Sequence, residues 1–220
     1  MNTLRNFIVL LFLMPVSAFA GIITSSEFTG THSEGFETIP GLGFTLTYED
    51  LFNGTATAVA ESTTGGALNI TGGWSFESLI NPYSGSFFMG TTGGPLAFEF
   101  DQALSAFGGF FGVNHVADTE DAPNGLAAFF DESDNLLAEV EISLGMGGSW
   151  TWNGWISAEE NIAKVILTSG FHDGGLLMVD DLQSVVATTN VTNVPEPQGF
   201  LLMMTALVFF AQRRIIAGKS

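Results

Sequence analysis

Three acidic side chains near the end of the body of the chain are well suited to bind a cation. Asp173, Asp180 and Asp181 lie close together in the sequence, and hard cations such as calcium take about six to eight oxygen ligands, many of them carboxylates. Because adjacent residues of a strand face opposite sides, only one of Asp180 and Asp181 can point into a given site. The alternative is that both carboxylates end a strand and contact backbone amides.

The aromatic segment WTWNGW, residues 150–155, could supply a different chemistry. Exposed tryptophans stack on the C–H faces of sugar rings while neighbouring polar groups bind the hydroxyls, whereas buried tryptophans fill a core. Alternation along a strand places Trp150 and Trp152 on one face and Trp155 on the other. Trp150, Trp152 and Asn153 are therefore candidate carbohydrate-binding residues, and packing in the core is the alternative.

Motifs for catalysis are missing from the sequence. His32, His115 and His172 lie in separate segments without the spacing of a zinc protease, and there is no G-x-S-x-G and no cysteine. A pair of carboxylates suited to glycoside hydrolysis is expected by chance in so acidic a chain. We therefore predict a protein that is not an enzyme. His115 lies in an acidic segment and is a further candidate for ligand binding, with a solvated loop as the alternative.

Charge excludes one class of partner. Residues 21–194 contain 22 acidic residues and one basic residue, Lys164, which gives a formal charge of −21. Such a body repels nucleic acid and attracts divalent cations. With no cysteine and 21 phenylalanines, it must be stabilised by a hydrophobic core or by a metal rather than by disulfides.

Hydrophobic alternation predicts an all-β body. Leu96, Phe98 and Phe100 share one strand face, and Val165 and Leu167 share another. Many short strands separated by turn residues favour an antiparallel β-sandwich of the jelly-roll type, and Asp131 to Asn135 is expected to form a hairpin turn. The predicted strands are 43–48, 55–60, 67–70, 86–89, 95–100, 106–113, 126–131, 136–143, 149–155, 162–169 and 176–185.

The N-terminal 20 residues have the three parts of a secretory signal peptide. Arg5 gives a positive start, residues 7–14 are apolar, and Ala18-Phe19-Ala20 is a cleavage site before Gly21. We predict that the chain is exported through this segment, an uncleaved anchor being the alternative.

The C-terminal end has the features of a membrane anchor. An apolar segment at about 198–212 is followed by Arg213 and Arg214. It is short for a transmembrane helix, which needs roughly 20 residues, although arginine side chains can extend to the interface. The positive-inside rule keeps the basic end cytoplasmic. A single-pass tail anchor is the simpler interpretation.

This end also resembles the PEP-CTERM sorting signal of bacteria that make exopolysaccharide. The resemblance rests on Val194, Pro195, Glu196 and Pro197, the apolar segment, and Arg213 and Arg214, in that order. It implies recognition of Pro-Glu-Pro by an exosortase, a membrane protease-transpeptidase that removes the tail, so that the membrane anchor is temporary. The expected organisation is a signal peptide at 1–20, a β-sandwich at 21–186, a polar linker at 187–193 and a sorting signal at 194–220.

The body is similar to an extracellular domain that recurs ahead of such tails, and to carbohydrate-binding modules of the galactose-binding jelly-roll type. The similarity rests on the segments GFETIPG at 35–41, LAF at 96–98, AFGGF at 106–110, AFFD at 128–131, NLL at 135–137, IAKV at 162–165 and VDDL at 179–182. It implies a calcium site between the first and last strands, where Glu37 would meet Asp180 or Asp181.

These observations predict a non-catalytic protein of the cell envelope or extracellular matrix, delivered by export and an exosortase-type system. Its β-sandwich is expected to bind polysaccharide, with calcium as cofactor. The alternative is a purely structural envelope protein without a small ligand, and a hydrolase acting on polysaccharide is disfavoured.

Overall fold

The computed structural model describes residues 21–39, 43–61, 66–75, 79–114, 125–158, 161–170 and 176–188. Five predicted features lie outside these residues: the signal peptide, the linker beyond Thr188, the sorting signal, His115 and Asp173. Within the described part of the chain, no helix is long and apolar enough to cross a membrane.

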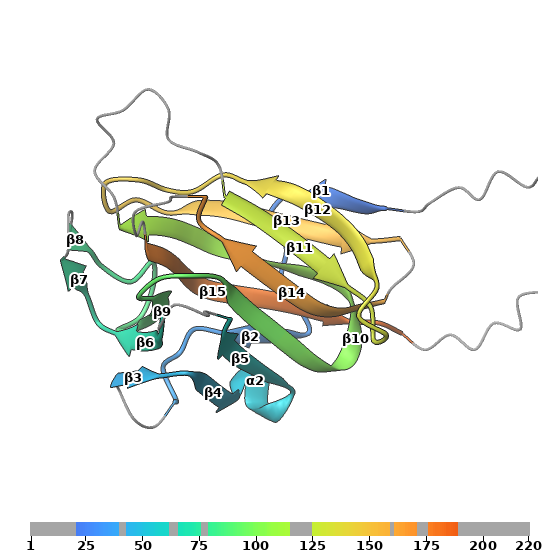
Figure 1. The fold of residues 1–220 in the computed structure, drawn as a ribbon, viewed down its shortest axis with the longest axis horizontal. Coiled ribbons are helices and arrows are strands. Elements are labelled where there is room, and N and C mark those ends of the chain that lie inside the picture. The colour runs from blue at the N-terminus through green and yellow to red at the C-terminus, as the bar shows by residue number, and fades with distance from the viewer. Residues whose placement is uncertain are drawn as a thin grey trace, which may run out of the picture. The chain divides into compact units, whose positions relative to one another are not determined.

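The described strands pair antiparallel and form two layers (Figure 1). The layer that we call the β14 layer consists, in spatial order, of β4 (Thr47–Asp50), β5 (Ala56–Ala60), the first half of β10 (Leu96–Asn114), β14 (Ile162–Thr168), β11 (Gly125–Phe130) and β12 (Leu136–Ile142). The β15 layer consists of β1 (Ile22–Ser25), β13 (Thr151–Ser157), the second half of β10, β15 (Leu176–Val186), β9 (Phe88–Thr91), β6 (Leu68–Thr71) and β3 (Gly43–Thr45), while β2 (His32–Glu34) pairs with the last part of β15.

One strand, β10, belongs to both layers. Its residues 96–100 pair with β5 and β14, whereas residues 106–114 pair with β13 and β15. The register shifts between Glu99 and Leu104, and the green ribbon of β10 curves from one layer into the other there (Figure 1). The sequence predicted two strands here, which was wrong: the polar residues that interrupt the apolar pattern mark a bend and not a break.

The core lies between the two layers. Phe129 of β11 meets Trp155 of β13 in an edge-to-face contact with ring centroids 5.2 Å apart, and the ring of Phe107 of β10 lies nearly parallel to the same indole with centroids 6.3 Å apart. Phe98 and Val165 are also fully buried in this core. The predicted inward alternation of Phe98, Val165 and Leu167 is confirmed.

The described elements confirm the all-β prediction, but the predicted strand 43–48 is wrong, since it is divided into β3 and β4, which pair in different layers. The short strands β1, β2, β7 (Trp74–Ser75) and β8 (Leu79–Ile80) were not predicted, nor was the single turn α2 (Leu51–Gly54). In this turn Phe52 and Asn53 have left-handed φ angles of 52° and 62°. The turn is held by buried Glu34, whose Oε2 accepts the Phe52 amide at 2.9 Å and whose Oε1 accepts the Phe36 amide at 2.6 Å.

The predicted hairpin turn between β11 and β12 is present. The Asp131 carboxylate accepts the backbone amides of Ser133 at 2.8 Å and Asn135 at 2.9 Å, and the Asn135 side chain donates to it at 3.0 Å. The hydrogen bond from the Asn135 side chain, together with these amides, lowers the pKa of Asp131. These acids therefore form a turn rather than a metal loop.

Candidate functional site

Four aromatic rings form a continuous row on the outer face of the β15 layer. Trp152 of β13 is paired with Phe110 of β10, and both point away from the core because Trp155 and Phe107 point into it. The Trp152 ring lies edge-on to Phe28 at 5.5 Å and to Phe110 at 5.3 Å. Tyr83 completes the row. We call these four residues, Phe28, Trp152, Phe110 and Tyr83, the aromatic row.

Tyr83 is the exposed member of the aromatic row. Its ring is stacked on Phe110, with centroids 3.5 Å apart and an interplanar angle of 15°. Phe110 is almost buried, whereas Tyr83 is 47% exposed. One side of the Tyr83 ring is therefore supported by Phe110, and the ring is open enough to contact a ligand.

Paired glycines let Trp152 lie against the strands. Gly154 and Gly108 are directly opposite each other in β13 and β10. A Cβ atom on Gly154 would lie 2.9 Å from Trp152 Nε1, and one on Gly108 would lie 3.0 Å from Trp152 Cζ2. The indole occupies the space that side chains would otherwise fill. Its N–H is buried and has no hydrogen-bond partner among the described residues.

Asp180 fixes the start of the loop that carries Tyr83. We call residues 81–87 the tyrosine loop. Asp180 Oδ2 accepts the backbone amides of Tyr83 at 2.7 Å and Ser84 at 3.4 Å, and its Oδ1 accepts the amide of Asp181 at 2.8 Å. Asp180 has no solvent-exposed surface. Burial raises the pKa of this carboxyl to about 7, against the lowering effect of the three amides.

Glu37 fixes the end of the same loop. Its Oε1 accepts the backbone amides of Ser86 at 2.6 Å and Phe87 at 3.0 Å. Gly85 has a φ of 60°, and a Cβ atom there would meet Glu37 Oε1. The loop wraps around this carboxylate oxygen, and only glycine allows so close an approach.

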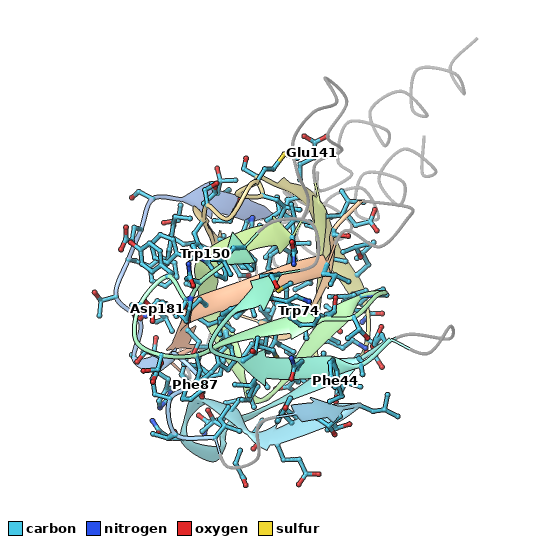
Figure 2. The ribbon with its side chains drawn as sticks, turned by 90° about the vertical axis from the view of Figure 1, so that its left-hand side faces the viewer. Phe44, Trp74, Phe87, Glu141, Trp150 and Asp181 are labelled. Atoms are coloured by element: carbon cyan, nitrogen blue, oxygen red, sulfur yellow. The ribbon has the colours of Figure 1, made fainter. Side chains whose placement is uncertain are left out.

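Trp150 holds the first residue of the tyrosine loop. Its Nε1 donates to the Asn81 carbonyl at 2.9 Å, and its ring meets Phe88 edge-on at 5.5 Å. It packs against a small second cluster of Ile80, Phe88, Leu176 and Met178. Figure 2 shows Trp150 on the same side of the molecule as Asp181 and Phe87. Trp150 thus supports the loop from a partly buried position.

Asn153 is committed to the backbone of a neighbouring segment. Its Oδ1 accepts the Ser143 amide at 2.9 Å, and its Nδ2 donates to the Ser143 carbonyl at 2.8 Å. It also alternates with Trp152 along β13, so the two point to opposite sides of the strand. The structure does not bring Asn153 to the aromatic row.

The four predicted calcium ligands are only partly brought together. Glu37 and Asp180 contact the same loop, but each through backbone amides. Asp181 is half-buried with a φ of 45°, and Asp173 lies outside the described residues. Among the described residues no group of three or more histidine, aspartate or glutamate side chains is placed to hold a metal. The calcium site remains a prediction.

A second aromatic pair involves β3, the edge strand of the β15 layer. Phe44 of β3 is 67% exposed and meets Trp74 edge-on at 6.2 Å, and Figure 2 shows both. Trp74 packs on the second cluster. The pair adds exposed aromatic surface at the far edge of the β15 layer.

Sequence reasoning missed Tyr83, Phe110 and Phe28. Only the turn-forming residues around Tyr83 mark it in the sequence, because Pro82 and Gly85 predict a loop whose side chains reach solvent. Phe110 lies in a run of apolar residues, and the sequence around it does not indicate whether its side chain points into the core or away from it.

No protein-family model matches the chain, and none of the curated proteins matches its sequence. Among solved structures, the tandem CBM22-1-CBM22-2 domain of Paenibacillus barcinonensis Xyn10C is similar over 79% of this chain and 50% of its own, with 16% identity and a TM-score of 0.42. This chain therefore spans half the length of that protein.

Two further structures are similar at the same level. TmCBM61 in complex with beta-1,4-galactotriose has 12% identity and a TM-score of 0.42, covering 70% of this chain and 95% of that one. The K2 cleaved adhesin domain of Lys-gingipain has 13% identity and a TM-score of 0.45, covering 70% and 97%. Likenesses this distant do not carry a function over to this chain.

Proposed function

We propose that this protein is an exported, non-catalytic β-sandwich that binds polysaccharide through the aromatic row. The observation that carries the proposal is the half-exposed Tyr83 ring, supported from behind by Phe110. Aromatic rings present a flat apolar surface with a partly negative face, which complements the C–H groups of a sugar ring. Support by Phe110 and the tyrosine loop limits the entropy that Tyr83 loses on binding.

The charge of the body favours an uncharged polysaccharide. The only basic residue between 21 and 194 is Lys164, and it is paired with Asp134 on the β14 layer. An acidic glycan would meet a strongly negative protein without an opposing cation. We therefore expect neutral glycans to bind, and acidic glycans to bind only when divalent cations are added.

Replacing Tyr83 by alanine is expected to weaken glycan binding by about tenfold, because the supported exposed ring is the centre of the contact. Leu126→Ala is the matched control. The exposed fraction of Leu126, 45%, is similar to that of Tyr83, but Leu126 lies in β11 of the other layer. Affinity electrophoresis through gels containing neutral polysaccharides measures both. Equal retention of the two variants and the unaltered protein would reject the aromatic row as the binding surface.

A purely structural envelope protein is the second candidate. This function is favoured because several residues predicted to bind a ligand instead make hydrogen bonds within the protein. Trp150 and Asn153 bind backbone groups, and Asp180 and Glu37 bind amides of the tyrosine loop. A protein that binds none of a broad panel of glycans, with and without calcium, would fit this function.

The sequence motifs at 1–20 and 194–214 support a proposal for delivery to the cell surface. We propose export through residues 1–20, transient membrane anchoring at about 198–212, and processing by an exosortase-type enzyme at Val194 to Pro197. We also propose that the strands of the sandwich are connected as in a jelly roll and that the body binds calcium. A rise in melting temperature when calcium is added would support the calcium site.

Replacing Pro195, Glu196 and Pro197 together by alanine is expected to leave the protein in the membrane fraction, because the exosortase would no longer recognise the tail. Cell fractionation in an organism with an exosortase measures the result, and Arg5→Lys, which keeps the positive start of the signal peptide, is the control. Release of the triple variant to the medium at the normal mass would contradict the sorting proposal.

A further inference from the structure

An asparagine lies between the two rings of the aromatic pair at the edge of the β15 layer. We call Phe44 and Trp74 the edge pair. Asn69 of β6 is directly opposite Phe44 of β3 on one side and directly opposite Gly90 of β9 on the other. A Cβ atom on Gly90 would lie 3.3 Å from Trp74 Cζ3, so the indole covers this glycine. In the register of the sheet, Asn69 therefore lies between Phe44 and the ring of Trp74.

The edge pair and Asn69 lie on the outer face of the β15 layer. Leu68 and Ile70, the neighbours of Asn69 in β6, are buried in the core between the layers. Because side chains alternate along a strand, Asn69 and its partner Phe44 point away from that core. Directly opposite residues have Cβ atoms about 5 Å apart. The amide of Asn69 is therefore within reach of a ligand that contacts the Phe44 ring.

The polar atoms of Asn69 are available to such a ligand. The residue is only partly buried, and its side chain has no hydrogen-bond partner among the residues that the structure describes. A side-chain amide can donate two hydrogen bonds and accept two. Asn153, by contrast, uses its amide on the backbone of Ser143. Asn69 thus has the polar chemistry that Asn153 was expected to provide beside an aromatic ring.

The strands around the edge pair are uncharged. Described residues 43–48, 66–75 and 79–98 contain no aspartate, glutamate, lysine, arginine or histidine, although residues 21–194 contain 22 acidic residues. A charged ligand would lose water here without gaining an opposite charge from these strands. Two aromatic rings and an unpaired amide suit a neutral sugar, whose C–H groups contact the rings and whose hydroxyl groups bind the amide.

We infer that the edge pair and Asn69 form a second glycan-binding site, and that one long neutral polysaccharide chain binds there and at the aromatic row together. The part that concerns the aromatic row rests on the proposed function. The part that concerns the edge pair rests on its own exposed ring, its amide and its uncharged surroundings.

The distance between the two sites makes binding depend on the length of the glycan. β6, β9 and β15 separate β3 from the second half of β10 (Figure 1). Phe44 and Phe110 are therefore four strand spacings apart, which is about 19 Å at ~4.8 Å per spacing. A disaccharide cannot reach both sites, whereas a long chain can. Contact at both sites makes the second binding step intramolecular, and this raises the affinity for the polymer without any new contact.

Affinity electrophoresis of the full chain tests this inference. The gels contain xylan, galactan, glucan or mannan, and the disaccharide of the polymer that retains the protein most strongly is titrated separately. We expect Phe44→Ala and Asn69→Ala each to weaken binding of the polymer by about tenfold or more, because one of two linked contacts is lost. Binding of the disaccharide should change less than threefold, because the aromatic row remains.

The control variant alters the opposite edge of the same layer. Ile23 is 58% exposed, similar to the 67% of Phe44, and lies in β1. Ile23→Ala should leave binding of both the polymer and the disaccharide unchanged. Because Phe44 is exposed, its removal should also leave the melting temperature close to that of the unaltered protein, and thermal unfolding of each variant checks this.

Tyr83→Ala, measured in the same gels, separates this inference from the proposed function. Weaker retention of both Tyr83→Ala and Phe44→Ala supports both sites. Weaker retention of Tyr83→Ala alone rejects the second site and leaves the proposed function standing. Weaker retention of Phe44→Ala alone supports the edge pair as a glycan site but rejects the aromatic row and joint binding.

Two other outcomes would overturn the inference. If none of the four polymers retains the unaltered protein, the second site and the proposed function are both rejected. If Phe44→Ala changes the sedimentation of the protein but not its retention, the edge pair is a contact between copies of the chain and not a glycan site.

Discussion

Replacing Trp155 by alanine is expected to lower the free energy of unfolding by about 4 kcal/mol, within the range for large aromatic residues in cores. Trp155 is 1% exposed and contacts Phe129 of one layer and Phe107 and Phe111 of the other. Its removal leaves a cavity where the two layers meet, and the surrounding rings cannot close it without shifting both layers. Denaturation by urea, monitored by circular dichroism, measures the change.

The adjacent residue provides the control. Ile156→Ala alters the same strand, but Ile156 is 38% exposed on the outer face, and we expect a loss of at most about 1 kcal/mol. Similar losses for the two variants would show that Trp155 does not join the layers as described.

The second large effect concerns pH. Asp180 has a pKa of about 7 in the folded protein and an ordinary value of 3.8 when unfolded. Between these values the folded state binds a proton that the unfolded state has lost, so stability falls as pH rises from about 4 to about 7. Below pH 4 the group is protonated in both states, and above pH 7 it is ionised in both.

The Asp180→Asn variant isolates this contribution. Between about pH 4 and pH 7 the unaltered protein should lose stability, whereas the variant lacks this loss. Relative to the unaltered protein, the free energy of unfolding of the variant is therefore expected to rise by about 1.4 kcal/mol per pH unit, and by at most about 4 kcal/mol in total. Urea denaturation at a series of pH values measures it. The lowered pKa of Asp131 also makes stability depend on pH, but in the opposite sense and only below its ordinary pKa. Because both proteins contain Asp131, its effect cancels in the difference between them. A difference that does not change with pH would show that Asp180 does not bind the proton.

Much of the fold follows from the alternation of apolar residues. Phe98, Val165 and Leu167 were expected to share core faces because strand side chains alternate, and the same rule separates Trp152 from Trp155. This pattern is local, so each strand can be identified from its own residues. It does not reveal whether adjacent strands are joined, and β10 was therefore divided in two.

The candidate site depends on contacts that no local pattern encodes. Tyr83 stacks on Phe110, and its amide binds Asp180, which is 97 residues away in the sequence. Ligand type alone suggested that Glu37 and Asp180 belong to one metal site. The structure places both against the tyrosine loop, where backbone amides bind both oxygens of Asp180 and one oxygen of Glu37. Which groups a carboxylate binds is decided by packing, and packing of this kind joins distant segments.

The pairing of the two ends of the body also determines when the molecule can fold. β1 pairs with β13 and β2 pairs with β15, while β10 needs β5 from before it and β14 and β15 from after it. Contacts so distant in sequence must be formed against a large loss of chain entropy, which slows folding. The β15 layer cannot be completed before the last strand, ending at Val186, has been made, because β2, β9 and the second half of β10 all pair with it. A chain shortened before β15 would lack the partner of β2 and one of the two partners of the second half of β10. Folding of the β15 layer must therefore wait until synthesis of the body is almost complete.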